Sequence, residues 1–478
     1  MTNQSSAGQS GPGDRPPITF ASLTAGLIWP KLWRTLPMAT RPGRLIVALV
    51  MLIVLLGLGS IYDRVAGPVA PGAGLDADPP PAERVQANLR LIISDANVVR
   101  SEFASDLLSQ ETIKPDQVRT AIIKSFRARA DELRQPDGHP VTADQWDRIR
   151  TPYAGALRDV DLLKGRGLFE TVSRNTARAF NEFILGVVTL HPTRSTEAVN
   201  WWWTRTIVPL FTKHFGAALV FTLLAMLILG VFGGAIARST ACDIAGWHAP
   251  GPGESIRFAW KRRFDFSMAL LGPALFIGAI ALTLAVVGAI ALRIPGIDVL
   301  TGVFYGPALL LGLFVALCLF GLCLGGLMLV PSVAVECTDW LDGVQRVYAY
   351  VAGAPGRLVL YLAALLTQGA LAYWALALIV AGAMNFTAGA MTGWLGAKPT
   401  ELAGQIEPFV FQIQHDIWAL SGTSAGTAYT MGLWELTTVL LLAAGVFSYL
   451  FTGGTTLYLA LRQVNDLQDM ADISRDMD

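Results

Sequence analysis

The chain has 478 residues, with 36 Lys and Arg against 36 Asp and Glu, so its formal net charge is zero. Only 15% of the residues are charged and 53% are apolar, which excludes an intrinsically disordered chain and argues against a plain soluble enzyme. Without a basic excess there is no surface for nucleic acid, and four cysteines are too few for a disulfide scaffold. This composition indicates a polytopic membrane protein.

Six apolar stretches are long enough to cross a bilayer, which takes about 20 helical residues. They cover residues 45–62, 214–237, 266–292, 299–330, 358–384 and 432–460. None shows the alternation of an outer-membrane barrel strand, so we expect helices, which satisfy their own backbone hydrogen bonds in lipid. The predicted fold is an all-α polytopic membrane bundle with six transmembrane helices, a helical extracytoplasmic insert and amphipathic surface helices.

Lys and Arg near the ends of these stretches predict the orientation. Those on one side are Lys31, Arg34, Arg41, Arg44, Arg238, Arg257, Lys261, Arg262, Arg263, Arg346, Arg357 and Arg462, whereas Arg293 and Lys398 lie on the other. The long segment 63–212 is left out of this count, because long loops cross the membrane largely regardless of charge. We therefore expect a multi-pass protein of the bacterial cytoplasmic membrane with both termini cytoplasmic. Cleavage of the first stretch as a signal peptide is an alternative, although the segment before it is long for one.

Five parts follow in chain order. They are a cytoplasmic tail with an interfacial helix (1–43), the first span (44–62), an extracytoplasmic linker and helical insert (63–198), a five-helix membrane domain (199–462) and a cytoplasmic tail (463–478). The apolar and tryptophan-rich segment 18–37 predicts a helix lying on the membrane, or one packed against a partner. Apolar stripes in the insert predict short helices that form a small unit leaning on the membrane rather than an independent domain.

Side chains that carry chemistry are scarce. The five histidines and four cysteines are dispersed, and no phosphate-binding or nucleophile motif occurs in a suitable context, so we expect no catalytic residue, cofactor or metal site. Trp201, Trp202 and Trp203 fit an aromatic belt at the outer interface, or alternatively a carbohydrate or cation site. Glu435 is expected to anchor or pack the last span, with an ion or proton site as the alternative. Gln368 is expected to join helices.

Glycines in the spans predict close helix packing. The candidates are Gly230, Gly234, Gly321, Gly325, Gly453 and Gly454. Because broken helices in transporters use the same residue type, the pair Gly453-Gly454 with its neighbouring threonines is also a candidate transport site.

The connections between spans two and three and between spans four and five share one pattern. Each has a small-residue exit, an acidic residue, an amphipathic helix and a basic residue before the next span, which suggests either a weak internal repeat or two ordinary surface helices. We expect the two helices to dock, with carboxylates of 336–342 facing arginines of 238–263; solvated faces are the alternative. This docking cluster comprises Arg238, Arg257, Glu336, Asp339, Asp342 and Arg346.

The same two connections resemble a family of uncharacterised bacterial six-span integral membrane proteins. The resemblance rests on two segments. Segment 235–265 has a small-Ala-Arg exit and the helix FAWKRRF, and segment 329–361 has a Pro/Ala-rich exit, an acid-x-Thr-Asp element and an Arg-x-Tyr-x-Tyr helix. The matching positions are Glu336, Thr338, Asp339, Asp342, Arg346, Tyr348, Tyr350 and Arg357. The pattern is also faintly similar to the membrane domains attached to some glycerophosphodiesterases, without their catalytic domain.

Two functions remain open on the sequence. One is a non-enzymatic scaffold or assembly protein that uses the insert and the surface helices to bind protein partners, and the scarcity of charge inside the spans favours it. The other is a permease-like transporter of a small or lipidic substrate, favoured by the weak repeat and the span glycines. A membrane lipid enzyme is a distant third, since no acid/base pair is visible. In each case the lipid bilayer is an expected partner.

Overall fold

The structure is a computed structural model. It describes residues 32–67, 75, 82–134, 143–291, 293, 302, 305–392, 405–406, 413–414 and 423–474. Most of the expected surface helix 18–37 and of the linker after the first span lie outside these residues. The described chain is all-α, as predicted, apart from a two-residue antiparallel ladder between β1 (Gln405–Ile406) and β2 (Ile413–Gln414).

Six helices among the described residues are long and apolar enough to cross a membrane, which confirms the six predicted spans. They are α4 (Pro42–Ala66), α12 (Phe215–Ile244), α14 (Arg263–Ala291), α16 (Tyr305–Gly325), α19 (Pro355–Thr392) and α20 (Thr423–Asn465). The fourth span continues from α16 through the 3-10 turn η2 (Gly326–Met328) into α17 (Leu329–Glu336). The chain is therefore a multi-pass membrane protein.

The helices extend past the apolar stretches that predict them. The longest, α20, has 43 residues, which corresponds to about 65 Å at 1.5 Å per residue. Hydropathy detects only the part of a helix that crosses about 30 Å of hydrocarbon. Hydropathy does not detect the ends of α19 and α20 that extend beyond the hydrocarbon. The predicted spans 358–384 and 432–460 are therefore shorter than these two helices.

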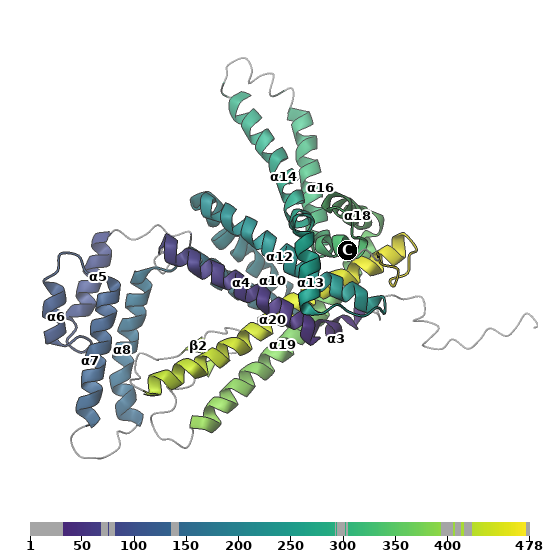
Figure 1. Cartoon of the computed structure of the whole chain (residues 1–478). Coiled ribbons are helices and arrows are strands. Elements are labelled where there is room, and N and C mark those ends of the chain that lie inside the picture. Colours follow the sequence, from purple (N-terminus) through teal and green to yellow (C-terminus); the bar gives the residue numbers. More distant parts are fainter. Residues whose placement is uncertain are drawn as a thin grey trace, which may run out of the picture.

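The spans meet at one end and diverge toward the other. In Figure 1 the α14–α16 pair and the α19–α20 pair leave a shared region in different directions. At that region α12 packs against α4, α14, α17 and α20. We call this region the convergent end. It consists of α3 (Thr35–Ala39), the start of α4, the second half of α12, α13 (Pro252–Lys261), α17, α18 (Trp340–Gly353) and the last turns of α20 with the chain after it.

The main hydrophobic core lies at the convergent end. Small residues such as Ala235 and Ala334 are buried there together with large ones such as Phe266 and Tyr458. The distant halves of the spans instead leave large apolar side chains exposed, among them Leu282 on α14. Exposed apolar side chains are expected on helices that face lipid, where no water opposes their exposure.

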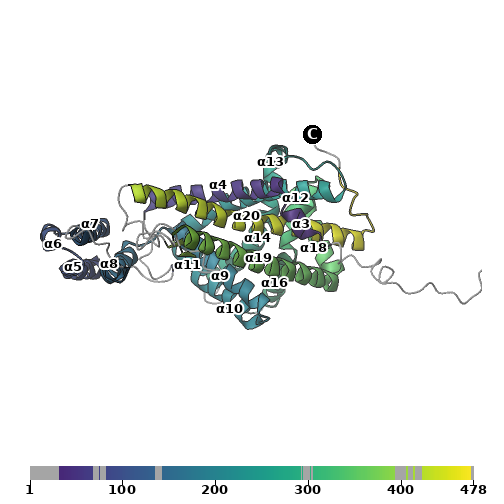
Figure 2. The same ribbon diagram turned by 90° about the horizontal axis from the view of Figure 1, so that it is seen from below.

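The insert between the first two spans divides into two parts. Its first part is a four-helix unit that consists of α5 (Ala82–Ser94), α6 (Ser101–Leu108), α7 (Pro115–Arg134) and α8 (Ala143–Lys164). This unit has its own core, in which the rings of Phe126 and Tyr153 lie 5.4 Å apart. Both views place it at the far side of the spans from the convergent end (Figures 1 and 2).

The second part packs against the membrane helices. It comprises α9 (Leu168–Val188), α10 (Pro192–Trp202), the π-helix η1 (Trp203–Ile207) and α11 (Val208–Lys213). Helix α9 contacts α4 and α19, and the Tyr373 hydroxyl of α19 donates to Asn181 Oδ1 over 2.7 Å. Helix α9 thus packs on the spans, whereas α5 to α8 enclose a core of their own.

Candidate functional site

Among the described residues, buried arginines gather at the convergent end, where two carboxylates each bind two arginines. The first is Asp243, in the last turn of α12. Its Oδ1 lies 2.7 Å from Arg41 Nη1, and its Oδ2 lies 2.9 Å from Arg44 Nη2. Arg44 is buried and also donates to the carbonyl oxygens of Met38 and Ser239, at 2.6 and 3.1 Å. This arginine therefore ties the start of the first span to the end of the second.

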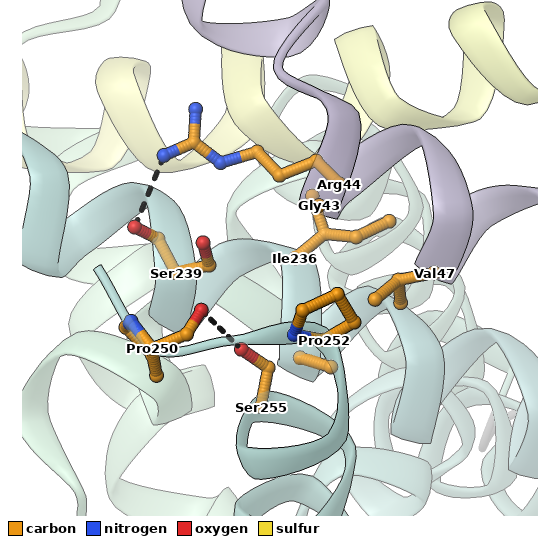
Figure 3. A pocket seen from close by; sticks show the side chains of 9 residues that line it. Gly43, Arg44, Val47, Ile236, Ser239, Pro250, Pro252 and Ser255 are labelled. Atoms are coloured by element: carbon orange, nitrogen blue, oxygen red, sulfur yellow. Dashed lines mark hydrogen bonds between the residues drawn. The ribbon is translucent and has the colours of Figure 1, made fainter.

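A small cavity lies beside Arg44 (Figure 3). Val47, Ile236, Pro252 and Ser255 contribute to its lining. Its volume is about 10 Å³, which is at most enough for one water molecule. Figure 3 also shows the hydrogen bond that the Arg44 guanidinium donates to the Ser239 carbonyl. The cavity is thus a gap between packed helices and is too small for a substrate.

The second carboxylate is Glu336, at the end of α17. Its Oε1 accepts hydrogen bonds from Arg462 Nη1 and from the Tyr458 hydroxyl, both at 2.9 Å. Its Oε2 lies 3.5 Å from Arg346 Nη1. Arg462 and Tyr458 come from α20, and Arg346 comes from α18. One nearly buried carboxylate thus joins three helices, and its charge is balanced by a buried guanidinium.

Tyr350, on α18, extends this group of side chains toward the C-terminus. Its hydroxyl donates a short hydrogen bond to Asp466, and its ring lies 5.5 Å from that of Tyr458. Burial and the hydrogen bond to Asp466 raise the pKa of the Tyr350 phenol above its usual value. For Arg346, burial would lower the pKa, but the charges of Glu336 and Asp342 outweigh it and raise the pKa. Both side chains therefore keep the proton that their contacts require.

Two buried arginines hold the chain that follows α20. Arg238 donates to the carbonyl oxygen of Ser474 over 2.9 Å. Arg462 donates to the carbonyl of Asp469 over 3.1 Å and to that of Asp472. Residues 466–474, which we call the C-terminal strap, also bury the side chains of Met470 and Ile473 in the main core. The strap closes the convergent end.

The structure corrects the expected docking of carboxylates against the arginines of 238–263. Glu336, Asp342 and Arg346 do lie together, and Asp342 Oδ2 is 3.1 Å from Arg346 Nε. Arg238, however, is buried beside α17 and donates to the carbonyl oxygen of Ala334 over 3.1 Å. Arg257 and Asp339 are exposed and form no ion pair within the described chain.

The reason is the end of α17. The last carbonyl groups of a helix lack intrahelical partners and carry partial negative charge. Arg238 donates to the Ala334 carbonyl in the last turn of α17. Arg262 donates a short hydrogen bond to the carbonyl of Cys337, the residue that ends the helix in a left-handed conformation with φ of 54°. Arginines of the connection between spans two and three thus reach the segment around 336, as predicted, but they bind its backbone carbonyl groups and not its carboxylates. Accordingly, α13 packs mainly on α12 and α4, whereas α18 packs mainly on α14 and α17.

The candidate packing glycines lie where helices approach closely. A Cβ atom on Gly230 would lie 2.9 Å from the backbone of Phe266, and one on Gly234 would lie 2.8 Å from the Phe266 ring. In the same way, a Cβ atom on Gly321 would lie 2.5 Å from the Tyr348 ring, and one on Gly325 would lie 2.6 Å from the Val347 side chain.

The Gly453-Gly454 pair does not interrupt its helix, because α20 runs continuously from Thr423 to Asn465. A Cβ atom on Gly454 would collide with the carbonyl oxygen of Leu327, whereas one on Gly453 would meet Thr35 at 3.7 Å. The pair therefore lets η2 approach α20, and it does not form the broken helix that a transport site would use.

Other candidates from the sequence also have partners. Gln368 donates to the carbonyl of Trp33 over 3.1 Å and accepts from the Tyr449 hydroxyl over 3.0 Å, so it joins helices as expected. Trp201 lies under the guanidinium of Arg178, 5.0 Å from its ring centre. Glu435 is half-buried on α20. The described residues contain no group of three His, Cys, Asp or Glu side chains placed to hold a metal ion.

Sequence reasoning missed the roles of Arg44, Arg462 and Tyr458. It used the two arginines only to orient the chain, although each has apolar neighbours along the helix, as in Leu459-Ala460-Leu461-Arg462. An arginine that follows apolar residues on a helix in this way could have been predicted to be buried. Their acceptors come from distant segments and leave no mark in the local sequence.

Comparisons with protein-family models, with curated proteins and with solved structures found no match. The family resemblance seen in the sequence therefore stays a prediction.

Proposed function

We propose that the protein is a non-enzymatic scaffold or assembly protein of the bacterial cytoplasmic membrane. In this proposal the convergent end lies in the cytoplasm, in line with the charge asymmetry of the connections. The four-helix unit α5–α8 then lies outside, where it is presented to protein partners.

The proposal rests on one observation: the buried polar groups form contacts between segments of the chain. Arg44, Arg238 and Arg462 are buried, and each donates to carbonyl or carboxylate oxygens of other segments. Within the described residues, the acceptors of these arginines are backbone carbonyl groups and the carboxylates of Asp243 and Glu336, and the cavity beside Arg44 holds one water at most. The polar side chains therefore hold the spans together, which is what a scaffold requires.

The α5–α8 unit supports the proposal independently. A separate core lets the unit keep its shape without the spans. Its surface exposes Leu91 on α5 and Leu162 on α8, two helices that contact each other. In this proposal, these two exposed side chains are the contacts offered to a protein partner.

Photo-crosslinking in intact cells tests this function. A photoreactive amino acid at position 91 or 162 should give the same discrete protein adduct, whereas one at Arg129, an exposed position on α7, should give little of it. Liposomes that contain the purified protein should show no solute flux above empty liposomes. Solute flux together with no adduct from positions 91 and 162 would reject the scaffold function and favour the permease-like alternative.

A further inference from the structure

The junction of α13 and α14 exposes aromatic and cationic side chains side by side. Trp260 is 56% exposed and Phe264 is 65% exposed. Arg257, Lys261 and Arg263 are exposed around them. The Arg263 guanidinium lies over the Trp260 ring, 5.5 Å from its centre. We call these five residues the α13 surface.

The other side of α13 packs against the rest of the protein. Ser255 and Ala259 are buried on the inner face, where α13 packs on α12 and α4. Arg262 turns inward to the carbonyl of Cys337. The α13 surface is therefore the outward side of a helix whose inner side and whose end are held in place.

The charge of this surface is not balanced by the protein. Within the described residues, no carboxylate pairs with Arg257, Lys261 or Arg263. Two acidic side chains lie near these cations in the chain. Glu254 accepts from the backbone N–H of Gly251 over 3.1 Å and so caps the start of α13. Asp265 is half-buried in the first turn of α14 and forms no ion pair with the three cations. Three cations remain available to a negatively charged ligand.

The position of the surface says which ligand meets it. Arg263 is the first residue of the membrane-spanning helix α14, so the α13 surface lies where a span leaves the hydrocarbon. Exposed Trp and Phe rings favour the interface between acyl chains and headgroups. Juxtamembrane clusters of Lys and Arg attract anionic lipids.

We propose that the α13 surface binds the headgroups of anionic phospholipids, with Arg257, Lys261 and Arg263 contacting the phosphate and Trp260 and Phe264 inserted beside the acyl chains. This activity is separate from the scaffold function and does not require a protein partner. It would anchor the convergent end in a leaflet that contains anionic lipid.

Native mass spectrometry of the full chain, released from nanodiscs of mixed phosphatidylglycerol and phosphatidylcholine, tests the proposal. Removing the charges by R257Q/K261Q/R263Q should weaken the tightest phosphatidylglycerol binding by at least about fivefold, the factor expected for one Lys or Arg at an anionic membrane surface. The matched control R84Q/R90Q/R158Q removes three exposed cations from the α5–α8 unit and should leave that binding unchanged. Equal retention by the parent and by R257Q/K261Q/R263Q would overturn the proposal.

Two further measurements keep the test decisive. W260A/F264A retains the charge and should also release phosphatidylglycerol, while its thermal unfolding midpoint stays at that of the parent because both rings are exposed. A photoreactive residue at position 260 should form lipid adducts in intact membranes. A discrete protein adduct at that position, with no lipid adduct, would assign the surface to a protein partner and overturn the lipid proposal.

Discussion

Arg238 and Ser474 are 236 positions apart in the chain, yet the buried guanidinium of Arg238 donates to the Ser474 carbonyl over 2.9 Å. The same guanidinium donates to Ala334 at the end of α17 and lies 5.2 Å from the centre of the Phe258 ring. One side chain of the second span thus holds the fourth span, α13 and the C-terminal strap. Buried donors that lose their acceptors are costly, so this relationship yields direct predictions.

Replacing Arg238 should destabilise the protein much more than replacing Arg257, its exposed neighbour in the same connection. Arg238→Ala removes hydrogen bonds to two segments and should cost on the order of 1–3 kcal/mol, whereas Arg257→Ala should cost less than about 0.5 kcal/mol. Thermal unfolding of both variants in detergent measures the difference. Equal midpoints for the two variants would contradict the contacts of Arg238.

Removing the C-terminal strap should loosen the convergent end. A chain that ends at Asn465 lacks the strap carbonyl groups that accept from Arg462 and Arg238, and it lacks the buried side chains of Met470 and Ile473. Arg238 keeps its hydrogen bond to the carbonyl of Ala334. We expect a lower unfolding midpoint and faster amide exchange in α17, measured by hydrogen exchange with mass spectrometry. Truncation after Ser474 keeps these contacts and is the matched control. A midpoint unchanged by the longer truncation would show that the strap does not stabilise the bundle.

Glycine 454 should be intolerant of any side chain. Gly454→Ala places a Cβ atom against the carbonyl of Leu327 and should cost about 1–3 kcal/mol, because the backbone has to move. Gly445→Ala lies on the same helix with open space around its Cβ position and should not destabilise. Detergent unfolding of the pair separates close packing from a general effect of alanine in α20. Tolerance of Gly454→Ala would argue against the tight contact with η2.

The hydrogen bond from Tyr350 to Asp466 predicts a pH dependence. The pKa of the Tyr350 phenol is raised in the folded protein, so the protonated hydroxyl contributes stability below the unfolded pKa of about 10. That contribution should decline as the pH rises above about 10, because the unfolded chain then loses its phenol proton more readily than the folded chain does.

The measurement is the difference in unfolding midpoint between the parent and Tyr350→Phe across this pH range. The parent should be the more stable protein below about pH 10, and its advantage should shrink at higher pH. A difference that grows with pH would reverse the sign and contradict the assigned contact.

The sequence predicts the features of the fold that depend on local pattern. The six spans follow from hydropathy, and the positions of Gly230 and Gly321 follow from the need for small residues where helices touch. The ion pair between Asp342 and Arg346 also follows a local pattern, because positions four apart on a helix are neighbours.

The contacts between distant segments could not be predicted in this way. Charge patterns led to the expectation that Arg238 pairs with carboxylates, but its acceptors are carbonyl groups, which every residue carries and which no sequence pattern marks. The partners of Arg462 depend on the strap folding back over α17, where Ser474 N donates to the carbonyl of Val335 over 3.3 Å. Such a return of the chain is visible only in three dimensions.

The buried polar groups of the convergent end hold the spans together. A double-mutant cycle between Glu336 and Arg462, whose atoms lie 2.9 Å apart, tests this role most directly. Each of Glu336→Gln and Arg462→Met should cost on the order of 3–5 kcal/mol, because it leaves the other charge buried. Their double variant should cost clearly less than the sum, with a coupling free energy of about 1–3 kcal/mol. Additive costs, with a coupling near zero, would contradict this role.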